Sequence, residues 1–134
     1  MPDPITIQIP RLHDGQREIV DAAARFNVLE CGRRFGKTTL GEWLAVTSAL
    51  AGHPVGWFSP TYKLLADAWR EVSRMVTPVV KSPNVQERRL ELITGGLIDF
   101  RSLDSVNSGR GRKYKRVLID EAGIVRDLQE CWHA

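Results

Sequence analysis

The sequence lacks any long apolar run and any recognisable export signal. Its 134 residues contain no stretch of about 18 consecutive apolar residues, the length that a membrane-spanning helix requires. Residues 1–10 lack the basic start and apolar centre of a secretory signal. From these two absences we expect a protein of the cytoplasm that has no membrane partner.

Cysteine and histidine are scarce as well. The two cysteines are Cys31 and Cys131, and Cys31 lies in a glycine-containing loop where a disulfide would hinder the approach of a ligand. We therefore expect two free thiols in a reducing compartment. The three histidines, His13, His53 and His133, are not spaced as metal ligands are, which argues against a zinc site.

Neither sign of charge is in large excess, since 19 basic and 16 acidic side chains give a net charge of +3. The surplus is concentrated in one cluster without acids: Arg110, Arg112, Lys113, Lys115 and Arg116. The cluster fits a contact with a DNA backbone or with a partner's acids, and it fits equally well a solvated loop before a buried strand. Tyr114, within it, is thin support for base stacking.

Helix and strand patterns alternate along the chain, which predicts one α/β domain with a mostly parallel sheet. Three helices are expected: residues 16–26 capped by Asp14, residues 38–50, and a strongly amphipathic helix after Thr61 that ends at Pro78. In the second helix, the expected apolar face carries Leu40, Trp43, Leu44 and Thr47. Trp43 and Trp69 are both expected in the core.

The expected strands are short and mostly apolar. They cover residues 27–30, 55–59, 90–93, 97–103 and 117–119. A two-residue turn at Gly95-Gly96 is expected to join the third and fourth, because adjacent glycines suit positive φ. Residues 82–84 are expected to form a turn, residues 104–113 a mobile loop, and residues 127–132 the start of a helix.

One segment carries a specific chemical signal. Residues 31–39 read C-G-R-R-F-G-K-T-T and lie between an expected strand and an expected helix, which is the context of a phosphate-binding loop for ATP. Gly36 allows close approach of the backbone to phosphate oxygens, Lys37 supplies a charge for the β- and γ-phosphates, and the Thr38 hydroxyl can bind Mg²⁺. The usual first glycine is replaced by Cys31, so a chance match is the alternative. The candidate nucleotide-binding residues are Gly32, Arg33, Arg34, Phe35, Gly36, Lys37, Thr38 and Thr39.

A second signal lies about eighty residues later, where an apolar strand ends in Asp120-Glu121. In an ATPase, Asp120 would hold Mg²⁺ through water, and Glu121 would act as the general base for the attacking water. Two acids at a strand end are more commonly just solvated. The catalytic interpretation gains weight because a phosphate-loop pattern precedes them in the same domain.

Two further hypotheses remain open from the residues alone. Arg33 or Arg34 can stabilise charge at the γ-phosphate as an arginine finger, or form a surface ion pair or a contact with a neighbouring subunit. Gln16 can hydrogen-bond the adenine edge, or be a solvated glutamine at a helix start.

Taken together, these segments resemble the N-terminal ATPase domain of the large terminase subunit of tailed phages. The resemblance rests on Gln16 in L-H-D-G-Q-R-E, the arginine-bearing phosphate loop, Ser59-Pro60-Thr61-Tyr62, Ser108-Gly109-Arg110-Gly111 and V-L-I-D-E-A-G. It covers nearly the whole chain.

The resemblance implies a P-loop NTPase of the ASCE type, a three-layer α/β sandwich, that uses ATP and Mg²⁺ to pump double-stranded DNA into a procapsid. It implies catalytic roles for Lys37, Arg33 and Glu121, a magnesium site at Thr38 and Asp120, and an adenine contact at Gln16. It also implies a portal protein and a small terminase subunit as partners, a ring of subunits, and a place at the procapsid portal in the host cytoplasm.

The chain departs from that family in length. Residues 1–134 are expected to be a partial ATPase domain, incomplete at its C-terminus, because the coupling motif, later strands and nuclease domain of the family are missing after Glu121. Two alternatives remain: a helicase-like DNA-dependent ATPase, with which Ala122-Gly123 disagrees at the second position, and a nucleotide-binding module without turnover.

Overall fold

The computed structural model describes residues 5–23, 36–103 and 113–120. Its elements are α1 (Asp14–Asp21), α2 (Lys37–Leu50), β1 (Pro54–Ser59), α3 (Tyr62–Val76), a 3₁₀ turn (Thr77–Val79), β2 (Val80–Asn84), β3 (Arg89–Leu92), β4 (Leu97–Ser102) and β5 (Arg116–Ile119). Several predictions fall outside the described residues. They are the strand at 27–30, the two cysteines, loop residues 32–35, the segment 104–112, Glu121 and the helix at 127–132.

The five described strands form one mixed sheet in the order β2-β3-β4-β1-β5. β1 runs parallel to both β4 and β5, whereas β3 is antiparallel to β4 and β2 is antiparallel to β3. The α/β class is therefore confirmed, but the expectation of a mostly parallel sheet is wrong for this part of the chain. The difference arises because the connection from β2 to β4 consists of two tight turns, which can only reverse the chain.

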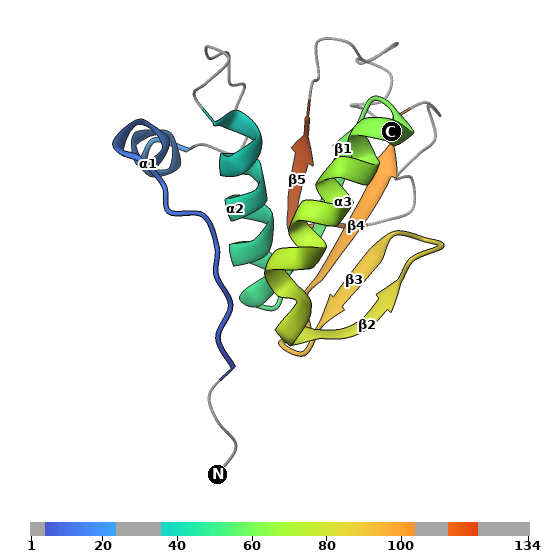
Figure 1. The fold of residues 1–134 in the computed structure, drawn as a ribbon. Helices are drawn as coiled ribbons and strands as arrows, with labels where there is room; N and C mark the ends of the chain where they lie inside the picture. The colour runs from blue at the N-terminus through green and yellow to red at the C-terminus, as the bar shows by residue number, and fades with distance from the viewer. Residues whose placement is uncertain (1–4, 24–35, 104–112, 121–134) are drawn as a thin grey trace.

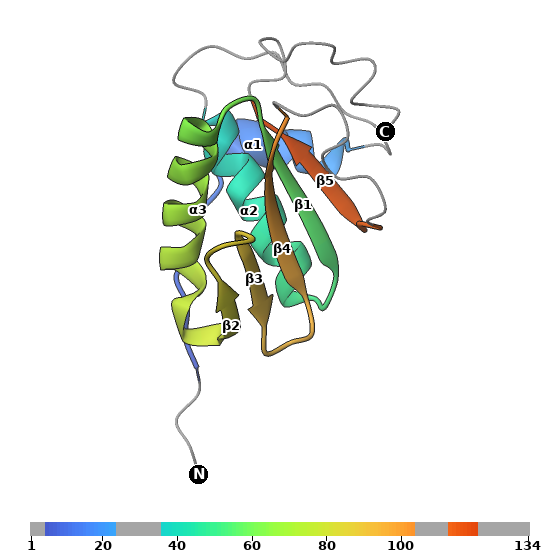
Figure 2. The ribbon, with the colours of Figure 1, turned by 90° about the vertical axis from the view of Figure 1, so that its right-hand side faces the viewer.

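Helices α2 and α3 lie side by side on the same face of the sheet (Figure 1). The view turned by 90° shows α3 and the strands as separate layers (Figure 2). The N-terminus of α2 and the carboxyl ends of β1, β4 and β5 lie at the same end of the sheet. In open α/β sheets that end is where ligands bind.

The core lies between the two helices and the sheet. Trp57 of β1 is 1% exposed and packs 6.3 Å from Phe100 of β4, measured between ring centroids. Trp69 of α3 meets the same Phe100 ring edge-on at 5.5 Å, so its predicted place against the core is confirmed. The other buried residues of the core are Ala45, Val46, Ala49, Val55, Leu65, Ala68, Val72, Val76, Val79, Leu90, Leu92 and Ile98.

The face of α2 that is buried differs from the predicted one. Of the predicted face only Leu40 is fully buried, beside Ala45, Val46, Ala49 and one acid, Glu42. Trp43 is only half-buried and lies outside the core. The prediction failed because the helix carries apolar residues around its whole circumference, so their spacing does not single out one face.

Helix α1 begins two residues earlier than predicted and ends earlier too. Its cap is His13, not Asp14: the His13 Nδ1 atom accepts a hydrogen bond from the Gln16 backbone at 3.2 Å, and the Gln16 Oε1 atom accepts one from the His13 backbone at 2.9 Å. This reciprocal pair is a capping box in which histidine replaces the usual serine or threonine. The helix ends at Asp21 with Ala22 as its C-cap.

Two predicted turns are also wrong. Residues 82–84 belong to β2, an exposed edge strand with a register shift between Val80 and Ser82, and Pro83 is tolerated there because an edge strand need not donate every hydrogen bond. The turn joining β3 to β4 is longer than two residues. It runs from the end of β3 at Leu92 to the start of β4 at Leu97, and only Gly95 has a positive φ.

Helix α3 matches its prediction most closely, and its cap can be tested. The Thr61 Oγ1 atom accepts a hydrogen bond from the Leu64 backbone at 3.3 Å. Thr61→Ala removes this acceptor, and we expect the free energy of unfolding to fall by about 1 kcal/mol. Thr61→Ser keeps the hydroxyl and should remain close to the unmodified protein in urea titrations. Equal stability of the alanine and serine variants would contradict this role.

Candidate functional site

Three strands end together beside helix α2. The Asp120 backbone donates to Phe58 O at 2.9 Å, and the Leu103 backbone donates to Ser59 O at 2.8 Å. These bonds continue the ladders one residue beyond the strands. They bring the ends of β1, β4 and β5, at Ser59, Leu103 and Asp120, together at the carboxyl edge of the sheet.

The N-terminus of α2 faces this edge without a side-chain cap. Its N-cap is Gly36, which has a φ of 87° and, being glycine, supplies no side-chain acceptor to the first turn. The side chains of Lys37, Thr38 and Thr39 are exposed. An uncapped helix start offers free backbone N–H groups and the positive end of the helix dipole, which together favour a bound anion.

Thr38 and Asp120 meet at this point although 82 residues separate them in the chain. The Thr38 hydroxyl donates to Asp120 Oδ1 at 3.4 Å. A hydroxyl and a carboxylate are both oxygen ligands of the kind that Mg²⁺ takes. Among the described residues, no three His, Cys, Asp or Glu side chains are grouped to hold a metal ion. A magnesium ion here would thus depend on phosphate and water oxygens in addition to these two residues.

Gln16 connects helix α1 to the same loop. It is 3% exposed, and its Nε2 atom donates to Gly36 O at 3.0 Å. A Cβ atom on residue 36 would lie 2.8 Å from that nitrogen, so glycine is required both for the positive φ and for the close approach. The interpretation of Gln16 as a solvated glutamine is wrong, because its amide is buried and bridges α1 and α2.

Glu42 lies one helical turn after Thr38 and was missed by sequence analysis. It is 2% exposed, and its Oε1 atom has no hydrogen-bond partner among the described residues. Burial raises the pKa of Glu42 to about 9, and a hydrogen bond with Glu71 and the negative charges of Glu71 and Asp120 act in the same direction. The side chain is therefore neutral at physiological pH. Its position four residues after Thr38 was the available signal, since both lie on one helical face.

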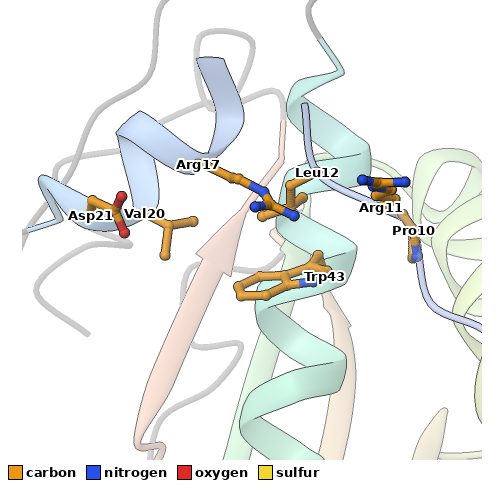
Figure 3. A pocket seen from close by; sticks show the side chains of 7 residues that line it. All are labelled: Pro10, Arg11, Leu12, Arg17, Val20, Asp21 and Trp43. Carbon is orange, nitrogen blue, oxygen red and sulfur yellow. The ribbon is translucent and has the colours of Figure 1, made fainter. Parts of the chain in front are cut away.

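A pocket of about 320 Å³ lies beside α2, on the side away from α3 (Figure 3). Trp43 contributes its indole ring from α2, while the facing side chains come from α1 and the segment before it. Trp43 thus lines a pocket, and its predicted place in the core is wrong. The remaining lining residues are Pro10, Arg11, Leu12, Arg17, Val20 and Asp21.

Of the predicted site residues, the structure brings together Gln16, Gly36, Thr38 and Asp120. Lys37 and Thr39 lie at the start of the same helix. Gly32, Arg33, Arg34, Phe35 and Glu121 fall outside the described residues. No helix in the described part of the chain is both long enough and apolar enough to cross a membrane.

The neutral Glu42 side chain makes a pH-dependent contribution to stability. The folded state holds a proton on Glu42 up to about pH 9, whereas the unfolded chain releases it near the ordinary value of 4.5. Between these limits the folded state binds more protons, so this group lowers the free energy of unfolding as pH rises, by at most about 1.4 kcal/mol per pH unit. The contribution of Glu42 to stability is fully favourable only below the ordinary pKa value of 4.5.

Glu42→Gln keeps the shape of the side chain but removes the group that ionises. We expect the variant to gain stability relative to the unmodified protein as urea titrations move from about pH 5 to about pH 8. Glu18→Gln, at an exposed position of α1, is the matched control and should leave the pH dependence unchanged. Parallel pH curves for Glu42→Gln and the unmodified protein would contradict a neutral buried carboxyl.

No protein-family model matches the chain, and no curated protein matches it either.

Proposed function

We propose that this chain is the ATP-binding and ATP-hydrolysing part of a DNA-packaging motor of the large terminase type, with the phosphate loop and sheet of a P-loop NTPase. The observation that carries the proposal is the contact between Thr38 and Asp120 at the uncapped start of α2. Two sequence motifs 82 residues apart thereby meet at the edge of the sheet where nucleotides bind in such folds.

The phosphates of ATP would be held by α2. The backbone N–H groups of Lys37, Thr38 and Thr39 belong to the first helical turn and have no side-chain cap. The exposed Lys37 ammonium adds a full positive charge to that of the helix dipole. Gly36 keeps the loop free of a side chain where the phosphates approach.

Magnesium fits the two oxygen donors that meet here. Thr38 and Asp120 would hold it, Thr38 through its hydroxyl and Asp120 through its carboxylate. A bound Mg²⁺ supplies neutralisation of the negative charge on the transferred phosphate. Glu42, being neutral, adds no further negative charge beside Asp120 at physiological pH.

Adenine recognition is consistent with the position of Gln16. Its Nε2 atom uses one of two N–H groups for Gly36 O, and its Oε1 atom uses one of two lone pairs for the His13 backbone. Its contacts with the described residues leave one donor and one acceptor on the same amide, which is the pair that the adenine edge requires. Gln16 would then link the base to the phosphate loop through Gly36.

Turnover is assigned to Glu121 as general base and to Arg33 as the charge that stabilises the γ-phosphate. The motor function, the portal and small-subunit partners and the ring assembly rest on the resemblance to large terminase subunits. Double-stranded DNA as the substrate has one further argument, the exposed side chains of Lys113 and Lys115 before β5 and of Arg116 at its start.

Nucleotide binding tests the core of the proposal. Lys37→Ala should weaken binding of Mg-ATP at least about tenfold, because it removes a charge-assisted contact to phosphate. Lys81→Ala is the matched control, since Lys81 is an exposed lysine on the edge strand β2. Titration calorimetry measures both. Equal affinity of the Lys37→Ala variant and the unmodified protein would contradict the proposal.

Turnover needs a second variant. Glu121→Gln should abolish phosphate release while retaining Mg-ATP binding, because the amide cannot accept a proton from water. Phosphate release by the unmodified chain and its loss in Glu121→Gln would support a catalytic domain. Binding by the unmodified chain without any phosphate release would instead favour a nucleotide-binding module.

A further inference from the structure

Strand β5 leads directly into Asp120, yet little in its own sequence specifies where the strand pairs. It has four residues and, among the described strands, pairs only with β1. Leu118 packs against the core, but Val117 and Ile119 on the other face are apolar too. When both faces of a strand are apolar, the hydrophobic pattern specifies register weakly, and a slip of one residue turns every side chain to the opposite face.

A side chain just before β5 reaches across β1 to the next strand. The Tyr114 hydroxyl donates to Asp99 Oδ2 at 2.9 Å, and Asp99 lies on β4. Gly56 of β1 pairs with Asp99 on one side and with Val117 on the other, so it lies directly beneath this crossing. A Cβ atom on Gly56 would lie 2.9 Å from the Tyr114 ring, which is closer than packing allows.

The far end of this contact is firmly held. Asp99 is 1% exposed, and Arg89 Nε donates to its Oδ1 atom at 2.7 Å, while Tyr114 takes Oδ2. Each carboxylate oxygen therefore has its own donor, which a buried charge requires. Burial raises the pKa of Tyr114, and so do the charge of Asp99 and the hydrogen bond to it, so the hydroxyl remains a donor. The Tyr114 ring also meets Phe58 edge-on at 6.1 Å.

We propose that Tyr114 is a positioning residue for Asp120, because its bond to Asp99 sets the register of β5 along β1. This inference rests on the proposed role of Asp120 in binding magnesium. In the observed register Phe58 pairs with Ile119, the Asp120 backbone donates to Phe58 O, and the Asp120 carboxylate meets Thr38 on the helical face of the sheet. A slip of one residue would turn the carboxylate to the other face, away from α2.

The same geometry assigns Tyr114 a role other than base stacking. Its ring is half-buried against Phe58 and its hydroxyl is engaged by Asp99. Its neighbours Lys113 and Lys115 are exposed, so within the described part of the basic cluster the tyrosine is anchored and these two lysines are solvated.

Tyr114→Phe removes one oxygen and retains the ring. The chain has two tyrosines, and Tyr62→Phe is the matched control because Tyr62 is 68% exposed at the start of α3. The first readout is hydrogen exchange at the backbone amides of β5 and of Asp120, which donates to Phe58 O. We expect exchange there to accelerate about fivefold in Tyr114→Phe, with α2 and α3 unchanged, because a local hydrogen bond is lost.

The second readout separates positioning from general loosening. The Mg²⁺ concentration for half-maximal ATP binding should rise about fivefold in Tyr114→Phe, whereas affinity for ATP in excess EDTA stays within about twofold, because the phosphate loop is untouched. Gly56→Ala is a second variant that displaces the Tyr114 ring by another route. It should accelerate exchange at the same amides.

Three outcomes would overturn the inference. They are unchanged exchange at Asp120 in Tyr114→Phe, uniform acceleration across α2 and α3 as well, and equal loss of ATP affinity with and without Mg²⁺. Failure of the unmodified chain to bind ATP would contradict the proposed function instead. In that case, accelerated exchange confined to β5 and Asp120 would still show that Tyr114 holds β5 in its place along β1.

Discussion

The packing of α2 across β1 is the constraint on which the proposed site depends. Ala45, Val46 and Ala49 bury one helical face against the sheet, and this contact fixes the height at which the helix begins. Because β1 runs parallel to β4 and β5, its carboxyl end and theirs meet the start of α2. A helix displaced by one turn would move the start of α2 by about 5 Å, and Thr38 would no longer meet Asp120.

Local signals in the sequence predict some elements well. Helix α3 has apolar residues at helical spacing, a threonine that caps its first turn and a proline just after its end, and all three signals agree. The contact between Thr38 and Asp120 was also predictable, because the phosphate-loop pattern and the acidic strand end both indicate a Mg-ATP site. Helix α2 was predicted in extent, but its buried face was not, because apolar side chains surround it.

The rest depends on contacts between distant residues, which spacing along the chain does not reveal. Asp99 looks like an ordinary polar position of a half-exposed strand, yet it is buried because Arg89 and Tyr114 engage it from other segments. Glu42 looks like the solvated face of a helix, yet it lies behind the predicted magnesium site. Strand β2 escaped prediction because an edge strand with exposed side chains and a proline has the composition of a turn.

The capping box of α1 has a thermodynamic consequence of its own. Helix α1 has eight residues, too few to be stable as an isolated helix, and its first turn is closed by the same glutamine that holds Gly36. The folding of α1 and the ordering of the loop at Gly36 are therefore linked equilibria, and linkage is reciprocal. Any ligand that favours the observed position of Gly36 also stabilises helix α1, which it need not touch. Fraying of α1 weakens the binding of that ligand by the same free energy.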